Sequence, residues 1–380
     1  RNNWEGTKPS ARTDAERAVD NAFINQLNDR TTNNPNEYQE RPKTGKKTDL
    51  DMFQLIYMED YEGFKDERWD ELLDSLTVSE MASLYNHGAF QTNSILHIGK
   101  VKTVDGDGPY GFTNFIGGKP RTCAYASEVI LASTWNTDLV YRMGECVGDE
   151  GLRGGDETDK VPFSGWYAPG ANIHRTPFGG RNGEYFSEDG FLSGKMAAAE
   201  IRGAASKGLY CYIKHFVAND QETSRQGLCT WLTEQSLREI YLKPFEIAVK
   251  EGKTRGLMSS FNRLGTKWTG GDYRLITEVL REEWGFKGAV ICDFNTSSSY
   301  YMDPKQMIYA GGDLNLTADQ FWTNFNESNP GDVTMLRRAA KNVLYMVSDS
   351  SAMNAPVDHY LPPLWVWLFS AAGILAVAGL

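Results

Sequence analysis

The sequence predicts an α/β protein whose core is a (β/α)8 TIM-type barrel, allowing for irregular units, and three observations support this prediction. From about residue 100 onward, short apolar runs that end in polar or glycine-rich loops alternate with longer amphipathic segments. This alternation is typical of a parallel sheet covered by helices. At least six such units fall within roughly 250 residues, which suits a closed barrel better than an open sheet. With 41% hydrophobic residues and 37 glycines, the chain can bury a sizeable core.

The expected strands are the short apolar runs, and the expected helices lie between them. We place the strands within residues 101–109, 128–135, 165–173, 208–216, 254–262 and 288–294. Helices are expected at 193–206, 233–250 and 273–284. Upstream of these units, apolar residues recur at helical spacing, namely Trp69, Leu72, Leu73 and Leu76. Thr77 and Glu80 then match a capping box, which predicts the start of the next helix.

Composition divides the chain into three parts. Residues 1–52 are polar and indicate a linker or an extension that wraps the surface. The barrel is expected over 53–350, followed at 351–380 by a linker and a C-terminal hydrophobic helix. The uncharged apolar run 364–380 is slightly shorter than the roughly 20 residues that span a bilayer. We expect a truncated transmembrane anchor, and a buried C-terminal helix is the alternative.

Charge and composition exclude several classes of function. The net charge of −11 argues against a nucleic-acid partner, because phosphates need a basic face. The five cysteines are odd in number, widely spaced and without a CxxC pair, so we expect mostly buried thiols rather than disulfides or a metal cluster. The five histidines are scattered, with no ligand pair at helical spacing. We therefore expect neither a metal nor a cofactor.

Polar side chains stand at the ends of five expected strands, where a barrel of this kind carries its chemistry. They are Asp107, residues 172–175, Lys214 with His215, residues 259–262, and Asp293. A carboxylate at Asp293 would be kept ionised by nearby cations, for which the candidates are Arg175, Arg181, Lys214 and His215. Each residue alone also has a structural interpretation, such as a core histidine, a helix cap, or an ion pair of an arginine with Glu184 or Glu188.

Several long motifs resemble glycoside hydrolase family 3. They are APGANIHRTPFGGRNGEYFSED at 168–189, KHFVANDQE at 214–222 and GFKGAVICDF at 285–294. Three shorter motifs, DGDGPYG at 105–111, SSFNRLG at 259–265 and AGGDLNL at 310–316, fit the same order and spacing. The resemblance covers roughly residues 65–350, and concordant motifs in one order are more specific than any single short pattern.

The resemblance implies a retaining, exo-acting β-glycosidase that removes terminal non-reducing β-D-glucosyl residues. Asp293 would form the covalent glycosyl-enzyme, and four residues would hold the hydroxyls of the terminal sugar, namely Asp107, Arg181, Lys214 and His215. Arg175 would hold these residues in position without contacting the sugar. The pocket would be lined by Met258, Phe261 and Phe294. Glu222 and Arg225 are expected to form a structural ion pair.

A retaining mechanism needs a second carboxyl group as acid/base, roughly 5 Å from the nucleophile. The resemblance places this group on an α/β-sandwich domain, and no such domain is evident in the sequence. A branch of the family uses a histidine instead, but the loop VANDQETSRQG contains none. We therefore expect the sandwich domain upstream of Arg1 as a missing partner, as in bacterial members with reversed domain order.

Three positions depart from the family pattern. Cys292 stands where Ser is common, Phe294 where Trp is common, and Phe261 where Tyr is frequent. These changes leave open a β-xylosidase and a non-catalytic glycan-binding barrel. The resemblance and the apolar C-terminal run together predict a bacterial cell-surface or membrane-anchored location, with a cytoplasmic location as the alternative.

Overall fold

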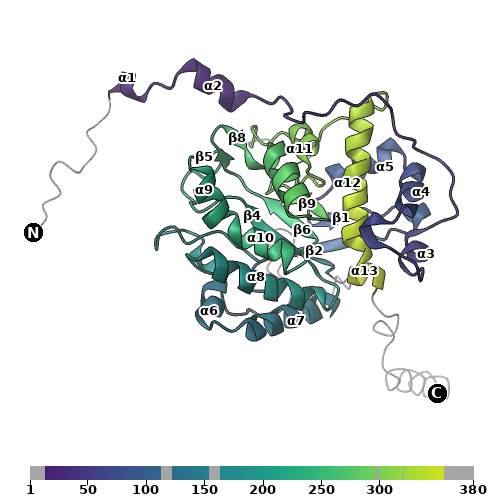
Figure 1. The fold of residues 1–380 in the computed structure, drawn as a ribbon, viewed down its shortest axis with the longest axis horizontal. Helices are drawn as coiled ribbons and strands as arrows, with labels where there is room; N and C mark the ends of the chain where they lie inside the picture. The colour runs from purple at the N-terminus through teal and green to yellow at the C-terminus, as the bar shows by residue number, and fades with distance from the viewer. Residues whose placement is uncertain (1–12, 113–121, 154–162, 297–298, 320, 355–380) are drawn as a thin grey trace, which may run out of the picture.

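The computed structural model describes residues 13–112, 122–153, 163–296, 299–319 and 321–354. Within these residues the centre is a six-stranded sheet in the order β1-β2-β3-β4-β6-β9 (Figure 1). All neighbours from β2 to β9 pair in parallel, and β1 pairs antiparallel with β2. The strands are β1 (Gln91–Thr92), β2 (Thr103–Asp107), β3 (Gly165–Tyr167), β4 (Tyr210–Phe216), β6 (Gly256–Ser259) and β9 (Ala289–Ile291). A small second sheet contains β5 (Cys229–Thr230), β7 (Arg263–Leu264) and β8 (Lys267–Trp268).

Irregular backbone joins the two edges of the central sheet, so that the sheet curls into a barrel-like ring. At β2, the backbone N–H of Asp105 donates to the carbonyl of Phe90 at 2.9 Å. Two residues earlier, the N–H of Gly88 donates to the carbonyl of Asn315 at 3.1 Å, and the segment that carries Asn315 bridges β9 in parallel. The described residues thus contain five parallel strands closed by two irregular stretches, rather than eight regular β/α units.

Helices surround this ring (Figure 1). The longer ones are α2 (Asn21–Asn28), α4 (Arg68–Ser75), α5 (Val78–Asn86), α7 (Thr137–Arg153), α8 (Gly190–Ala205), α10 (Lys243–Lys250), α11 (Pro304–Ala310) and α12 (Pro330–Ser348). Shorter ones are α1 (Asp14–Arg17), α3 (Met52–Ile56), α6 (Glu128–Ser133), α9 (Glu234–Ser236) and α13 (Ser351–Asn354). Two segments have π-helical backbone, η4 (Leu237–Tyr241) and η6 (Arg274–Glu283). The helices predicted at 193–206, 233–250 and 273–284 are confirmed, as is the capping box at Thr77.

One predicted strand is wrong. Residues 128–135 contain α6 rather than a strand. Glu128, Leu131 and Ala132 are buried, whereas Ile130 is 58% exposed. This i, i+3, i+4 spacing of buried residues is that of a helix with one packed face. A short apolar run cannot be assigned to strand or helix by periodicity alone. The tertiary contacts of α6 with α8 decide this case.

Glycines allow α7 and α8 to approach closely. A Cβ added at Gly203 of α8 would lie 2.0 Å from the carbonyl oxygen of Tyr141 on α7. A Cβ added at Gly144 of α7 would lie 2.3 Å from the carbonyl oxygen of Glu200 on α8. The small residues in these two helices therefore permit a backbone separation that larger side chains would prevent.

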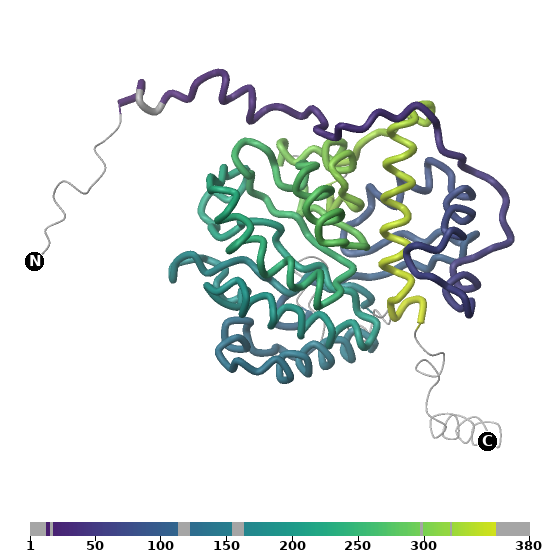
Figure 2. The backbone as a smooth tube through the Cα atoms, in the orientation of Figure 1, coloured from purple at the N-terminus to yellow at the C-terminus, as the bar shows by residue number. Residues whose placement is uncertain are grey.

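The N-terminal segment crosses the barrel surface before α3 begins (Figure 2). Asn34 Nδ2 donates to the Tyr309 carbonyl at 2.9 Å, and Arg41 Nε donates to the Glu327 carbonyl at 2.6 Å. Gln306 donates in turn to the carbonyl of Thr31 at 2.9 Å. The polar composition that predicted a surface extension supplies these contacts to barrel carbonyls and amides.

The predicted C-terminal apolar helix at 364–380 lies outside the described residues, and among the described helices none is long and apolar enough to cross a membrane.

The expectation of mostly buried thiols is wrong. Only Cys211 and Cys292 are buried, whereas Cys123 and Cys146 are exposed and Cys229 is intermediate. Residue spacing argued against a disulfide framework but could not tell that Cys123 lies in an irregular segment, Cys146 on the exposed side of α7 and Cys229 in β5.

Candidate active site

A cavity of about 670 Å³ lies at the carboxyl ends of the parallel strands, within the size range of small-molecule sites. Asp107 ends β2, Tyr167 ends β3, and His215 is close to the end of β4. Met258 on β6 and Asp293, two residues after β9, complete the same edge. In-register parallel pairing aligns these strand ends, so residues far apart in sequence meet in one place.

Lys214 and Asp107 form an ion pair across the floor of the cavity. Lys214 Nζ donates to Asp107 Oδ1 at 3.0 Å, and the lysine side chain is only 4% exposed. The pair is held between β2 and β4, which are separated by β3 in the sheet. It offers a fixed donor and a fixed acceptor side by side, the arrangement that adjacent hydroxyls of a sugar require.

His215 faces Asp293 from the next position of β4. Its Nε2 lies 3.7 Å from Asp293 Oδ2, and both residues are buried. Asn172 fixes the histidine backbone, because its side chain donates to the His215 carbonyl and accepts from the His215 N–H. Tyr185 Oη lies 3.5 Å from Nδ1 on the other side of the ring. The imidazole is therefore oriented by its surroundings before any ligand binds.

Burial dominates the electrostatics of this pair. It raises the pKa of Asp293, and the cations of Arg181, Arg225 and Lys214 oppose that increase. Burial, together with the same cations, holds the pKa of His215 well below its ordinary value. The imidazole is thus neutral and supplies no positive charge, contrary to the expectation that His215 helps to keep the carboxylate ionised. Arg175 is likewise not among the cations that act on Asp293.

Asp293 keeps one carboxylate oxygen for a ligand. Oδ1 accepts from the backbone N–H of Phe294 at 2.7 Å. Oδ2 is buried and has no hydrogen-bond partner within the described chain. A buried carboxylate oxygen without a partner is costly for the fold, which is a feature expected of a reactive site rather than of a structural cap.

Arg181 forms a fork-to-fork pair with Glu184 at the side of the cavity. Nε donates to Oε1 at 3.0 Å, and Nη2 donates to Oε2 at 2.6 Å. Although burial acts in the opposite direction, these bonds and the nearby cations bring the pKa of Glu184 below its ordinary value. Arg181 therefore does form the ion pair with Glu184 that its structural interpretation predicted. Both residues of the pair nevertheless line the cavity.

Most of the predicted site residues come together, and one does not. Besides the ionised groups, Met258, Phe261 and Phe294 all line the cavity. Arg175 is exposed and bonds Gln221 at 3.2 Å, outside the cavity that holds Asp293. Its neighbour in sequence, His174, donates from Nε2 to the Tyr185 carbonyl at 2.8 Å instead. The two arginines of the 168–189 motif thus have different surroundings.

Sequence reasoning missed several residues that line the cavity. They are Phe90, Tyr167, Glu184, Gln226, Thr296, Ser299 and Leu316, together with the pair Glu222 and Arg225, which was expected to be purely structural. Tyr167 lies within a predicted strand, and Thr296 and Ser299 lie in the segment that follows Asp293, so position along the chain could have indicated them. Phe90 and Leu316 belong to the irregular stretches that close the ring. Leu316 is the last residue of the 310–316 motif, but the motif did not indicate that this side chain faces the cavity.

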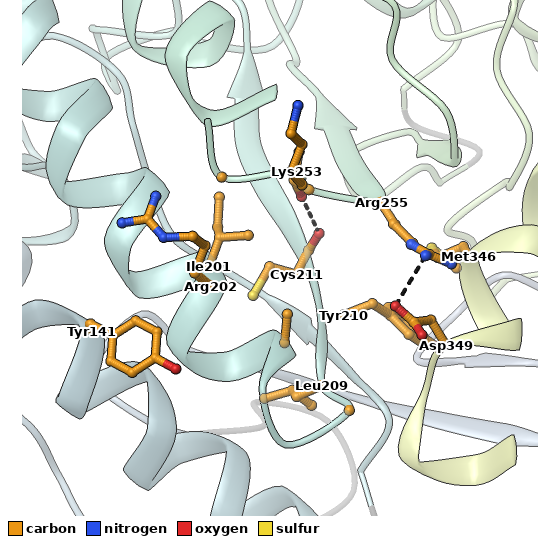
Figure 3. Close-up of a pocket in the computed structure, with 14 residues that line it drawn as sticks. Tyr141, Ile201, Arg202, Leu209, Tyr210, Cys211, Lys253, Arg255, Met346 and Asp349 are labelled. Carbon is orange, nitrogen blue, oxygen red and sulfur yellow. Dashed lines mark hydrogen bonds and ion pairs between the residues drawn. The ribbon is translucent and has the colours of Figure 1, made fainter. Parts of the chain in front are cut away.

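A second cavity, of about 400 Å³, lies at the amino ends of β4 and β6 (Figure 3). Figure 3 shows Asp349 paired with Arg255, and the two side chains are 3.0 Å apart. Asp349 is the single carboxylate among the described residues that line this cavity. Because that carboxylate is already paired, the arrangement does not offer the chemistry found at the carboxyl ends of the strands.

Comparisons with known proteins match the part of the chain that carries most of the cavity around Asp293. Residues 110–343 match the glycosyl hydrolase family 3 N terminal domain. A β-glucosidase of Rhizobium radiobacter is 38% identical over 251 residues, which are 65% of this chain and 29% of that protein. A β-glucosidase of Ruminococcus albus is 43% identical over 188 residues, which are 50% of this chain and 19% of that protein.

Solved structures agree with this match. The structure of β-glucosidase 3B from Thermotoga neapolitana in complex with glucose superposes with a TM-score of 0.65 at 32% identity, over 78% of this chain and 45% of that one. The β-glucosidase from Paenibacillus barengoltzii gives a TM-score of 0.67 at 26% identity, over 89% of this chain and 37% of that one. The chain therefore spans less than a third of the length of these two curated relatives and less than half of these two structures.

Proposed function

The chain belongs to glycosyl hydrolase family 3, and we propose that it forms the nucleophile-bearing, sugar-binding part of a retaining, exo-acting β-glucosidase. One observation carries the proposal. Asp293 presents an unpartnered carboxylate oxygen beside His215, in a cavity that also holds the Lys214–Asp107 pair. Hydroxyl-binding groups and a reactive carboxylate are thus built into one enclosed space, as hydrolysis of a glycoside requires.

In the proposed reaction, Asp293 Oδ2 attacks the anomeric carbon of a terminal β-glucosyl unit. The bond from that carbon to the leaving-group oxygen breaks as the ester bond to Asp293 forms. Lys214, Asp107, Arg181 and the neutral His215 would bind the sugar hydroxyls. Water then hydrolyses the glycosyl-enzyme, which restores the original configuration. The enclosed floor suits one terminal sugar, which supports exo-action.

The general acid is proposed to come from outside the described chain. Three other carboxyl groups line the cavity, those of Asp107, Glu184 and Glu222, and each has a cationic partner within 3.0 Å. In each pair a cation already occupies a carboxylate oxygen, so none of the three is a free carboxyl group beside the leaving group. The small share of each relative that the chain covers fits an α/β-sandwich domain elsewhere in the protein. We propose this domain upstream, in the reversed order of some bacterial members.

Location stays a proposal that rests on sequence alone. We propose a bacterial cell-surface position, held by the apolar segment 364–380. Expression of a fusion of residues 351–380 to a soluble reporter, followed by membrane fractionation, tests it. Recovery of the reporter in the soluble fraction would remove the anchor from the proposal.

The decisive experiment for the enzyme avoids the missing acid. We would treat the full chain with 2,4-dinitrophenyl 2-deoxy-2-fluoro-β-D-glucoside, whose leaving group departs without protonation. One fluoroglucosyl adduct is expected by intact-mass spectrometry, and peptide mapping should place it on Asp293. Asp293→Asn should abolish labelling, whereas the matched control Asp138→Asn, on the exposed face of α7, should label normally.

A negative result would be equally informative. If the folded wild type forms no adduct with this reagent or with the corresponding xyloside, the nucleophile assignment fails. Retained affinity for glucose in that case would favour the non-catalytic glycan-binding barrel. Faster labelling by the xyloside than by the glucoside would instead favour a β-xylosidase.

A further inference from the structure

The Glu222–Arg225 pair lies in the same cavity as Asp293, although neither residue is needed for the steps described above. Both belong to the loop that follows β4, and both line the cavity with the neighbouring Gln226. Their side chains are 27% and 32% exposed, whereas those of Lys214 and His215 are 4% and 2% exposed. The cavity therefore passes from an enclosed floor at the β4 residues to an open side at this pair.

Arg225 is held in place from three directions. Its Nη1 lies 3.0 Å from Glu222 Oε2, and its backbone N–H donates to the Glu222 carbonyl at 3.2 Å. Its guanidinium stands 4.6 Å from the ring centre of Phe261. Glu222 is in turn packed on the loop that carries Arg181, because a Cβ added at Gly180 would lie 3.0 Å from the Glu222 side chain.

Most N–H donors of the Arg225 guanidinium nevertheless have no acceptor among the described residues. Apart from the ion pair with Glu222, no described oxygen accepts a hydrogen bond from the Arg225 side chain. An arginine carries five N–H donors in a fixed fork. With one face over Phe261 and one nitrogen at Glu222, the remaining donors are left for the cavity that the residue lines. They are oriented before binding, so little side-chain entropy is lost when a ligand accepts from them.

We propose that Arg225 is a specificity-determining residue for the leaving-group side of the site, and that it selects a hydroxyl-bearing sugar over an apolar group at that position. The inference rests on the glycosidase function proposed above and deepens it. A terminal sugar occupies the enclosed floor, with its anomeric carbon at Asp293, so the leaving group must extend toward the open side. There it meets N–H donors, for which sugar oxygens are the matching acceptors.

Affinity for two ligands separates this role from a structural one. Glucose fills the floor alone, whereas the non-hydrolysable, sulfur-linked analogue of cellobiose also fills the leaving-group side. Calorimetric titration of the full chain should give Arg225→Met an affinity for the sulfur-linked disaccharide about tenfold weaker than that of wild type. Its affinity for glucose should stay within about twofold of wild type. Glu222→Gln should cause a smaller loss with the same ligand selectivity, because it releases the guanidinium.

Control variants define what would overturn the proposal. Arg225→Lys keeps the charge without the fork and should give an intermediate loss. Arg274→Met, which removes an arginine that is 76% exposed at the start of η6, should change neither affinity. Equal weakening of glucose and disaccharide by Arg225→Met would mean that the residue supports the whole pocket, and an unchanged disaccharide affinity would mean that it makes no contact. Either result overturns the inference.

A different set of results would overturn the proposed function without deciding against the role of Arg225. If the wild type binds both ligands but Asp293 is not labelled by the fluoroglucoside, the enzyme assignment fails while the ratio of the two affinities still decides the role of Arg225. If the wild type binds neither ligand, the function and the inference fall together.

Discussion

His215 Nε2 lies 3.7 Å from Asp293 Oδ2, and burial keeps the imidazole neutral beside the carboxylate. This pair differs from the three neighbouring ion pairs of the cavity, in which a permanent cation contacts a carboxylate within 3.0 Å. A neutral imidazole at this distance leaves the Asp293 carboxylate oxygen available to attack a sugar. A cation in close contact would stabilise the negative charge of that oxygen and so make it a weaker nucleophile.

The first prediction concerns His215 itself. His215→Ala should slow labelling of Asp293 by the fluoroglucoside by about 10- to 100-fold, because one oriented donor to the sugar is lost. His215→Gln, which keeps an N–H donor, should recover part of the rate. The measurement is the rate of adduct formation by mass spectrometry, with circular dichroism as the check on folding. An unchanged rate for His215→Ala would exclude the residue from the sugar site.

The pH dependence of labelling should report on Asp293. The nucleophile must be ionised, and burial raises its pKa, so the rate should increase with pH through an inflection above the ordinary value of 3.8. The Arg181 cation lowers this pKa, so Arg181→Met should move the inflection to higher pH. The position of the inflection, rather than the maximal rate, is the readout, since Arg181 is also expected to bind sugar. An inflection that stays in place would contradict the electrostatic assignment.

A buried carboxyl pair should make stability depend on pH. Glu200 on α8 and Glu128 on α6 are fully buried, and their carboxyl oxygens have no hydrogen-bond partner among the described residues. Burial raises the pKa of Glu200 to about 8, above its ordinary 4.5. The folded state therefore favours the protonated form, so stability is fully present below about pH 4.5 and is lost as pH rises through about 8.

Glu200→Gln tests this dependence. The variant should melt several degrees above wild type at pH 8.5, where the charged form of Glu200 favours the unfolded state of the wild type, and close to wild type at pH 5. Differential scanning calorimetry at both pH values gives the comparison. The residual decline of the variant with pH should come from Glu128, Asp105 and Asp220, whose pKa values burial also raises. A constant difference at the two pH values would contradict the assignment.

The contact between α7 and α8 gives a prediction about stability alone. Gly203→Ala would place a Cβ 2.0 Å from the Tyr141 carbonyl oxygen, so the helices must separate. We expect a loss of about 3 kcal/mol in the free energy of unfolding, near the upper end of typical overpacking effects. Urea denaturation measures the loss, and labelling of Asp293 in the folded fraction should persist. A loss below about 1 kcal/mol would show that the two helices can move apart at little cost.

The sequence determined much of the site because strand ends are marked locally. Asp107, Lys214, His215 and Asp293 each lie in or directly after an apolar run, and parallel strands place such residues at one edge. The same reasoning located five of the strands of the central sheet. It failed at 128–135, where a run of four apolar residues fits a helix and a strand equally well and only packing against α8 distinguishes them.

Tertiary structure alone decided which loop residues face the cavity. Arg175 and Arg225 both lie on loops beyond strand ends, yet Arg225 lines the cavity over Phe261 and Arg175 is exposed beside Gln221. The closure of the ring through Phe90 and Asn315 was not predicted either, because irregular backbone has no periodicity and the 310–316 motif does not specify which backbone it contacts. Residue type and spacing fix local structure and the chemistry available, whereas the direction of a loop side chain depends on contacts between segments far apart in the chain.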